Sequence, residues 1–373
     1  MFHDIDHAAP QYSPEWQRGQ HRDSLAHLKR KGGLLMKARE VALAMVICAW
    51  NAVAVPADQS ASQAVSSHVE AARRAAGSDH GFIFGRLCED PIRAVQAAPA
   101  SGEVPAELTT TDPARKWYAE PARVFDDLFF LGQTAFSVWG LRTSEGIILV
   151  DSIFDYSVEA EVIEGLRKLG MDPAQIRYVI ISHAHGDHSG GAGILQRHGA
   201  RIVMSEADWQ LYEKSTDKVK ATRDIVATDG MAIKLGGATV RVYLTPGHTQ
   251  GTISTVLPVH DNGRPHVAAL WGGTLFNFRD SPEDPRDARL KSYAASAARF
   301  REVARTAGAD ILLSNHTAYD GTTVKLPALA RRQPGQPNPY VIGPDAVQRY
   351  FRVAEECAIA TRMATGITPA KGQ

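Results

Sequence analysis

Short apolar runs and amphipathic stretches alternate along most of the chain, and their spacing predicts both strands and helices. The unbroken apolar runs from Ile147 to Val150 and from Tyr178 to Ile181 are typical of strands buried on both faces. In residues 157–169 the apolar side chains recur at helical spacing, which predicts an amphipathic helix. By the same criteria we expect further strands at 124–131, 135–141, 202–204, 231–235, 239–244, 252–257, 266–271 and 311–313, and helices at 58–95, 193–198, 287–305 and 345–360.

The order of these elements indicates the fold class. Strands come first, followed by helix, strand, helix, a run of strands, helix, strand and helix. Two sheets with helices packed outside them satisfy that order, whereas a simple βαβ repeat does not. The dipeptide Asn262-Gly263 predicts a two-residue hairpin between two of the later strands. The sequence therefore predicts an α/β protein with two sheets between helical layers.

The N-terminal part of the chain differs in composition from the rest. From Met36 onward the sequence has a basic start, an apolar middle and small-residue exits, which indicates a secretory signal peptide. Its apolar run is too short to favour a transmembrane helix, and the alternative is a genuine leader with a buried helix. We expect translation to start at Met36. The resulting division is a non-native or disordered leader at 1–35, a signal peptide at 36–57, a helical extension and linker at 58–116, and a catalytic domain at 117–373.

Composition excludes some partners and leaves others open. The 373-residue chain carries 41 basic and 41 acidic residues, so it lacks the basic footprint of a nucleic-acid or membrane-surface protein. We expect a small-molecule substrate, no membrane contact beyond export, and a periplasmic or secreted location; the oligomeric state is left open. Cys48 lies in the predicted signal peptide. Cys88 and Cys357 could form a disulfide in an oxidising compartment, or could stay as two buried thiols.

A dense group of metal-ligand side chains occurs near the middle of the chain. The segment His183-Ala-His-Gly-Asp-His188 places three imidazoles and one carboxylate within six residues. It follows a predicted buried strand and precedes a glycine-permitted turn, so its side chains can converge on one point. Imidazole nitrogen and carboxylate oxygen suit zinc, and also iron or manganese. The alternative is a solvated polar loop, but this spacing favours a metal site.

Two further histidines stand where predicted strands end. His248 follows the strand at 239–244, and His316 follows the strand at 311–313. Sites assembled from several strands are usually built at such strand ends. Either histidine alone could be a packed or capping residue. Their shared placement favours a role in the same site.

These motifs resemble the signature of the metallo-β-lactamase superfamily, and the resemblance extends roughly from Phe125 to His316. It implies an αββα sandwich with the metal site at one edge of the sheets. It also implies two zinc ions per chain, one held by His183, His185 and His248, and the other by Asp187, His188 and His316.

The segment Leu270-Trp-Gly-Gly-Thr-Leu-Phe276 departs from the superfamily pattern. Many members carry a bridging Asp there, and some lactamases a Cys. Here Thr274 takes that place. The missing acid disfavours the glyoxalase, lactonase and RNA-processing branches, and a small hydroxyl residue at this position is similar to the third subclass of metallo-β-lactamases. That subclass often has a serine two positions further on that helps to hold the substrate carboxylate, and Phe276 stands there instead.

The resemblance implies metal-assisted hydrolysis. A water on a zinc ion with three neutral ligands ionises near neutral pH, against a bulk pKa of about 15.7, and can attack a carbonyl carbon. Asp187 would orient this nucleophile as the catalytic carboxylate. Asp151 is expected to hold an imidazole or a backbone group, with a turn residue as the alternative. Thr274, Phe154 and Trp139 are expected to contact substrate, although apolar packing would explain the two aromatic residues equally well.

The function predicted from these features is an exported zinc hydrolase that opens β-lactam rings and so confers antibiotic resistance. The alternative within the same fold is a hydrolase of another ester, thioester or lactone. A di-iron redox centre would call for a bridging carboxylate and a flavin domain, and the sequence shows neither. A purely structural zinc site would be rich in cysteine, which this set is not.

Overall fold

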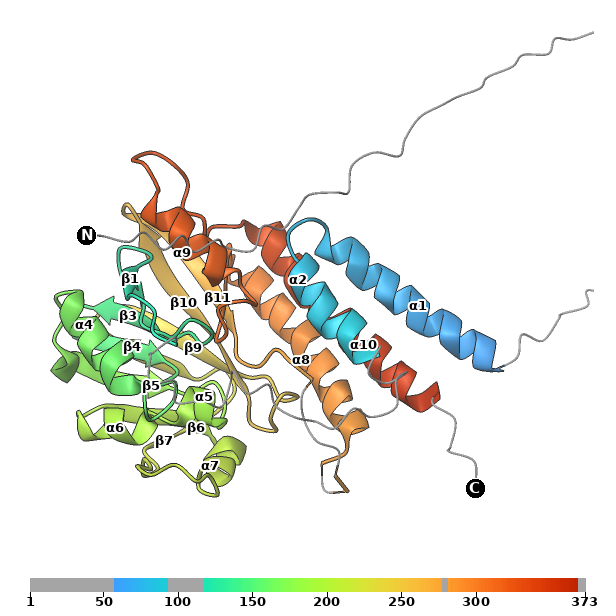
Figure 1. Ribbon diagram of the computed structural model, residues 1–373, viewed down its shortest axis with the longest axis horizontal. Helices are drawn as coiled ribbons and strands as arrows, with labels where there is room; N and C mark the ends of the chain where they lie inside the picture. Colours follow the sequence, from blue (N-terminus) through green and yellow to red (C-terminus); the bar gives the residue numbers. More distant parts are fainter. Residues whose placement is uncertain (1–56, 93–116, 277–280, 283, 368–373) are drawn as a thin grey trace, which may run out of the picture. The chain divides into compact units, whose positions relative to one another are not determined.

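The computed structural model describes residues 57–92, 117–276, 281–282 and 284–367 (Figure 1). The predicted leader, the predicted linker and all but the last residue of the predicted signal peptide lie outside these ranges. The described residues belong to one compact unit. Within the described ranges, every helix is either too short or too polar to cross a bilayer.

The first sheet has seven strands that lie side by side in chain order. The first four pair antiparallel, and the remaining strands add in parallel. The strands are β1 (Ala122–Arg123), β2 (Leu128–Phe130), β3 (Trp139–Thr143), β4 (Gly146–Val150), β5 (Ile176–Ile180), β6 (Arg201–Ser205) and β7 (Ile225–Ala227).

The second sheet has five strands in the order β12-β11-β10-β9-β8. Its strands are β8 (Ala232–Leu235), β9 (Ala238–Leu244), β10 (Ile253–Asp261), β11 (Arg264–Trp271) and β12 (Ile311–Ser314). The strands β8, β9, β10 and β11 each pair antiparallel with the next, and β12 pairs parallel with β11. The predicted hairpin is confirmed, because Asn262 and Gly263 join β10 to β11 with φ angles of 51° and 76°.

Helices flank both sheets (Figure 1). Their bounds are α1 (Ala57–Ala76), α2 (Gly81–Phe84), α4 (Glu164–Lys168), α5 (Gly186–Ser189), α6 (Ala192–Arg197), α7 (Glu206–Tyr212), α8 (Arg286–Thr306), α9 (Thr322–Ala330) and α10 (Pro344–Ile367), with π-helical turns η1 (Gly85–Glu89) and η3 (Glu159–Ile163) and a 3₁₀ turn η4 (Pro173–Gln175).

Three apolar layers hold the fold together, and β4 shows why its sequence lacks alternation. Ile148 and Val150 pack between the two sheets, whereas Ile147 and Leu149 pack against the helices on the outer face of the first sheet. Both faces of the strand are therefore buried. A third layer joins the second sheet to α8, α10 and the N-terminal helices. The predicted two-sheet sandwich with outer helices is confirmed.

The N-terminal extension (57–92) packs on the C-terminal helix. In Figure 1, α1 lies along α10, and Ala72 and Ala76 of α1 share a buried cluster with residues of α10. A disulfide joins Cys88 to Cys357, whose Cα atoms are 4.7 Å apart and whose sequence separation is 269. The structure thus settles the pairing that the sequence left open, and it fastens the extension to the sandwich.

Removing this disulfide should destabilise the protein, because the bond restricts the unfolded chain over a very long loop. We expect the Cys88→Ser/Cys357→Ser variant to lose about 2–4 kcal/mol of unfolding free energy in urea titrations. A reductant should shift the denaturation midpoint of the wild-type protein in the same direction. Equal midpoints with and without reductant would contradict the structural role of the bond.

Candidate metal centre

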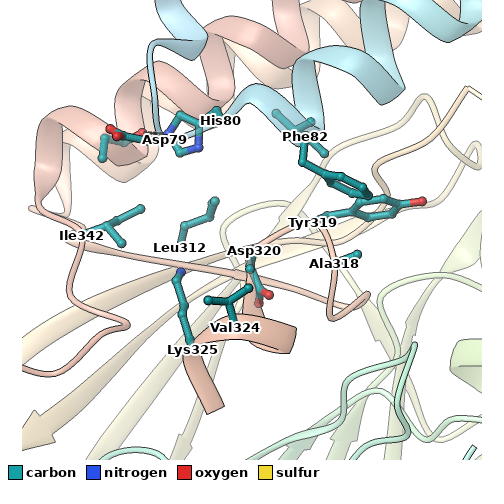
Figure 2. Close-up of a pocket in the computed structure, with 13 residues that line it drawn as sticks. Asp79, His80, Phe82, Leu312, Ala318, Tyr319, Asp320, Val324, Lys325 and Ile342 are labelled. Atoms are coloured by element: carbon teal, nitrogen blue, oxygen red, sulfur yellow. Dashed lines mark hydrogen bonds between the residues drawn. The ribbon is translucent and has the colours of Figure 1, made fainter. Parts of the chain in front are cut away.

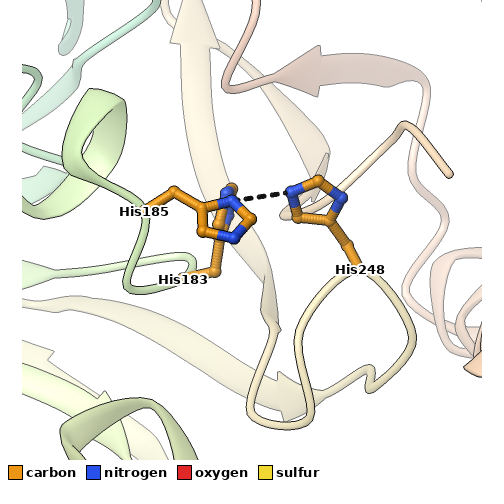
Figure 3. A group of neighbouring side chains, drawn as sticks. All are labelled: His183, His185 and His248. Atoms are coloured by element: carbon orange, nitrogen blue, oxygen red, sulfur yellow. Dashed lines mark hydrogen bonds between the residues drawn. The ribbon is translucent and has the colours of Figure 1, made fainter. Parts of the chain in front are cut away.

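Loops at the ends of three strands bring the predicted ligand residues together. His183 and His185 follow β5, His248 follows β9, and His316 follows β12. Each of His183, His185 and His248 offers a nitrogen atom, and these atoms lie within 4.8 Å of one another. Figure 3 shows the rings of His183 and His185, which share the loop after β5, beside the ring of His248 from the loop after β9.

Hydrogen bonds set which ring nitrogen of each imidazole faces inward. The Nδ1–H of His183 donates to the Gly272 carbonyl oxygen, and the Nδ1–H of His248 donates to the Leu275 carbonyl oxygen, both at 2.8 Å. The lone pair of each ring is then on Nε2. His248 Nε2 lies 3.1 Å from His185 Nδ1. His183 Nε2 is buried and has no hydrogen-bond partner among the described residues. A buried nitrogen without a partner is costly, so this group fits a cation.

A second group adjoins the first. His188 Nε2 lies 3.0 Å from Asp187 Oδ2 and 3.2 Å from His316 Nε2. Asp187 Oδ2 and His316 Nε2 are 3.7 Å apart. His183 also lies within 4.8 Å of Asp187 and His188 through its ligand nitrogen, so the two groups share a border. A carboxylate and two imidazoles are a donor set that divalent zinc accepts.

Asp151 fixes the orientation of the second group. It is fully buried, and its Oδ2 accepts hydrogen bonds from His188 Nδ1 at 3.0 Å and from the Ser182 hydroxyl at 2.9 Å. Its Oδ1 accepts from the Ser182 backbone N–H at 2.6 Å. The structure thus places Asp151 against an imidazole, as the sequence predicted. The residue has a φ of 68°, a left-handed conformation that is uncommon outside Gly, Asn and Asp.

Burial and charge divide the imidazoles into two classes. Burial lowers the pKa of His183 and His248 well below its ordinary value, and that of His316 to about 3, so these rings are neutral at physiological pH. Burial also lowers the pKa of His188, but the Asp187 and Asp151 carboxylates outweigh it and raise the value to about 10. A metal ion bound at His188 must therefore replace a proton.

Two supporting residues were not found from the sequence. Asn315 Nδ2 donates to the Ser182 hydroxyl at 3.0 Å and to the Gly272 carbonyl at 2.7 Å. Asp208 Oδ2 accepts from the Ala184 N–H at 3.1 Å and from the Thr249 hydroxyl at 3.0 Å. Asn315 stands next to a predicted ligand, which was an available signal. The sequence around Asp208 gave no such signal, because the residues that Asp208 contacts lie far from it in the sequence.

A cavity of about 690 Å³ opens beside the imidazoles, and its walls correct part of the sequence prediction. Phe154 lines it, as expected. Trp139 does not: it is 1% exposed, its Nε1–H donates to the Ser314 carbonyl at 2.9 Å, and it packs between the sheets. Thr274 is also absent from the described lining and is only 2% exposed. Phe276 turns away and packs edge-on against Tyr293 at 4.8 Å.

Comparison with known proteins agrees with the fold and the motif. The family model of the metallo-β-lactamase superfamily matches residues 132–261. A subclass B3 metallo-β-lactamase of Bradyrhizobium japonicum superposes with a TM-score of 0.56 at 26% identity, covering 65% of this chain and 94% of that one. A metallo-β-lactamase of Cronobacter sakazakii gives a TM-score of 0.55 at 27% identity, with coverages of 66% and 94%.

Curated relatives align over shorter stretches. A hydroxyacylglutathione hydrolase of Acidiphilium cryptum is 32% identical over 120 residues, or 32% of this chain and 42% of that protein. A metallo-β-lactamase type 2 of Bacillus cereus is 31% identical over 159 residues, or 42% of this chain and 57% of that protein. The matched segment and the fold are similar to those of the metallo-β-lactamase superfamily, a fold that implies divalent metal binding. The chain spans about half the length of these curated relatives.

Replacing the Asp151 carboxylate should weaken metal binding. Asparagine tolerates the left-handed backbone, so Asp151→Asn isolates the loss of the charged acceptor from His188. We expect metal affinity to fall about 10- to 100-fold in chelator competition. Asp155→Asn is the matched control, since Asp155 lies in the same loop and outside the described cavity lining. Equal affinities for the two variants would count against the supporting role of Asp151.

Metal loading should also release a proton from His188. Near pH 6 the buried His183, His248 and His316 are already neutral, whereas His188 carries its proton. Metal-bound water ionises only near pH 7 in comparable sites, so it adds little at pH 6. Calorimetric titrations in buffers of different ionisation enthalpy should therefore report release of about one proton. A release near zero, or one that involves every imidazole, would contradict this assignment.

Proposed function

We propose that the protein is an exported zinc-dependent hydrolase that opens the amide ring of β-lactams. The observation that carries the proposal is the pair of adjoining groups, His183/His185/His248 and Asp187/His188/His316, beside one cavity. No carboxylate or thiol stands at Thr274, the place of the bridging ligand in many superfamily members. The likeness to a subclass B3 enzyme at 26% identity supports the same assignment.

The two groups would hold two zinc ions, and the chain's own residues would organise the reaction. Bound zinc supplies a Lewis acid and a water that ionises near neutral pH. Asp187 lines the cavity, and His188 beside it holds the pKa of that carboxyl below its usual range despite burial. Asp187 would therefore stay ionised, orient the attacking water, and relay a proton from it to the leaving nitrogen. Phe136 and Phe154 pack against each other and form an apolar wall of the cavity.

The proposed location is the periplasm or the extracellular space. The disulfide between Cys88 and Cys357 supports it, because such bonds persist in oxidising compartments and are rare in the cytosol. The predicted signal peptide is the second argument, from the sequence alone. Activity against β-lactams in such a compartment would give antibiotic resistance.

A second candidate is hydrolysis of another ester, thioester or lactone. The observation that favours it is the burial of Thr274 and Phe276, which leaves the apolar Leu275 between them to line the described cavity, without the hydroxyl contact expected there. The partial match to a hydroxyacylglutathione hydrolase supports it as well.

Metal analysis and turnover on one sample test the proposal. We expect close to two zinc ions per chain, hydrolysis of nitrocefin, loss of activity with a chelator, and recovery when zinc is restored. The His183→Ala variant should lose about one zinc ion and most activity, because the central nitrogen of the site is removed. No β-lactam turnover at high enzyme concentration, together with turnover of a thioester or lactone, would favour the second candidate. A well-ordered iron pair would overturn the zinc assignment.

A further inference from the structure

The N-terminal extension contributes two side chains to the cavity beside the imidazoles. Phe82 of α2 and Arg86 of η1 both line it. Among the described lining residues, Arg86 alone carries a permanent positive charge. The superfamily model begins its match at residue 132, so both residues belong to a segment outside the matched region.

Packing of the extension accounts for the direction of these two side chains. Ile83, Leu87 and Cys88 are buried in the cluster shared with α8 and α10. Phe82 and Arg86, one helical turn apart, occupy the remaining face, where Phe82 is 55% exposed and the Arg86 side chain is 47% exposed. The disulfide at Cys88 lies two residues after Arg86, so the backbone that carries Arg86 is tied covalently to α10. The chain here forms a π-helical turn, a feature frequent at functional sites.

Tyr319 connects the extension to the candidate metal centre. Its ring stacks on Phe82 at 6.1 Å, as Figure 2 shows, and lies 5.0 Å from the ring of His316. The Arg86 guanidinium interacts with Tyr319 and donates from Nη1 to Asp90 at 2.9 Å. These contacts orient the guanidinium without using all five of its N–H donors. Arg86 therefore contacts Tyr319, which in turn contacts the predicted ligand His316.

Phe276 stands where the resembling subclass often has a serine that helps to hold the substrate carboxylate. It is buried against Tyr293, so this position offers no polar contact to a substrate anion. We propose that Arg86 supplies that contact, and that the natural substrate carries a carboxylate which the guanidinium binds. A planar guanidinium matches a carboxylate with two parallel hydrogen bonds. The inference rests on the proposed function only in taking this cavity as the substrate site, and it applies to a β-lactam or to an anionic thioester alike.

Equilibrium binding of paired ligands tests the role of Arg86 without requiring turnover. The probes are monohydroxamates of dicarboxylic acids of increasing length, each compared with its terminal amide on the metal-loaded protein. The hydroxamate oxygens bind the metal, and the pair differs only in the charge offered to Arg86. At the best length we expect the acid to bind about tenfold more tightly than the amide in the wild-type protein, as one charge-assisted contact provides.

Variants separate the charge of Arg86 from its bulk. The acid-to-amide preference should disappear in Arg86→Met and should be kept in part by Arg86→Lys. It should persist in Arg74→Met, which removes an exposed arginine of α1 outside the described cavity lining. Metal content and melting temperature show whether each variant folds. If Arg86→Met does not fold, the acid-to-amide preference of Arg86→Lys is compared with that of the wild type instead.

The outcomes distinguish this inference from the proposed function. A preference of the wild type that Arg86→Met retains, or no preference in the wild type, overturns the inference. An Arg86-dependent preference in a protein that hydrolyses no β-lactam supports the inference and rejects the β-lactam assignment. Nitrocefin turnover whose KM does not depend on Arg86 supports the β-lactam assignment and rejects the role of Arg86.

Discussion

The site depends on one constraint, which is that buried imidazole rings must present unprotonated nitrogens to a common point. Carbonyl oxygens meet this constraint at His183 and His248, where each accepts the outward Nδ1–H. At His188 the acceptor is the Asp151 carboxylate. Burial keeps the first two rings neutral, while the carboxylates around His188 hold a proton there that a cation replaces. The same contacts therefore set tautomer, orientation and charge together.

The sandwich makes this convergence possible. Ligand residues follow β5 in one sheet and β9 and β12 in the other, so the inter-sheet core fixes the distances between loops. Asp208 and Asn315 then tie the loops to one another. On the far side of the second sheet, the disulfide and the buried face of the extension join residues 57–92 to α10. The extension thereby adds Phe82 and Arg86 to a cavity whose other described lining residues belong to the sandwich.

Much of this was accessible from the sequence, because periodicity and strand-end motifs are local signals. The two-sheet fold, the hairpin at Asn262 and the candidate ligand residues follow from such signals. The burial of Trp139 and Thr274 could not be read from the sequence, since a strand pattern does not tell which buried layer a side chain enters. The short strand β7 and the helix α9, which contains Pro327, were missed because their patterns are brief or interrupted. Arg86 could not be assigned, because its approach to the cavity depends on the fold and the disulfide.

We propose that specific nitrogen and oxygen atoms define two adjoining zinc positions. Anomalous diffraction at the zinc edge, on crystals of the zinc-loaded protein, tests it most directly. We expect two peaks, one about 2.0–2.1 Å from His183 Nε2, His185 Nδ1 and His248 Nε2, and one at similar distances from Asp187, His188 Nε2 and His316 Nε2. A single peak, or a peak bound through Nδ1 of His183 or His188, would contradict the account.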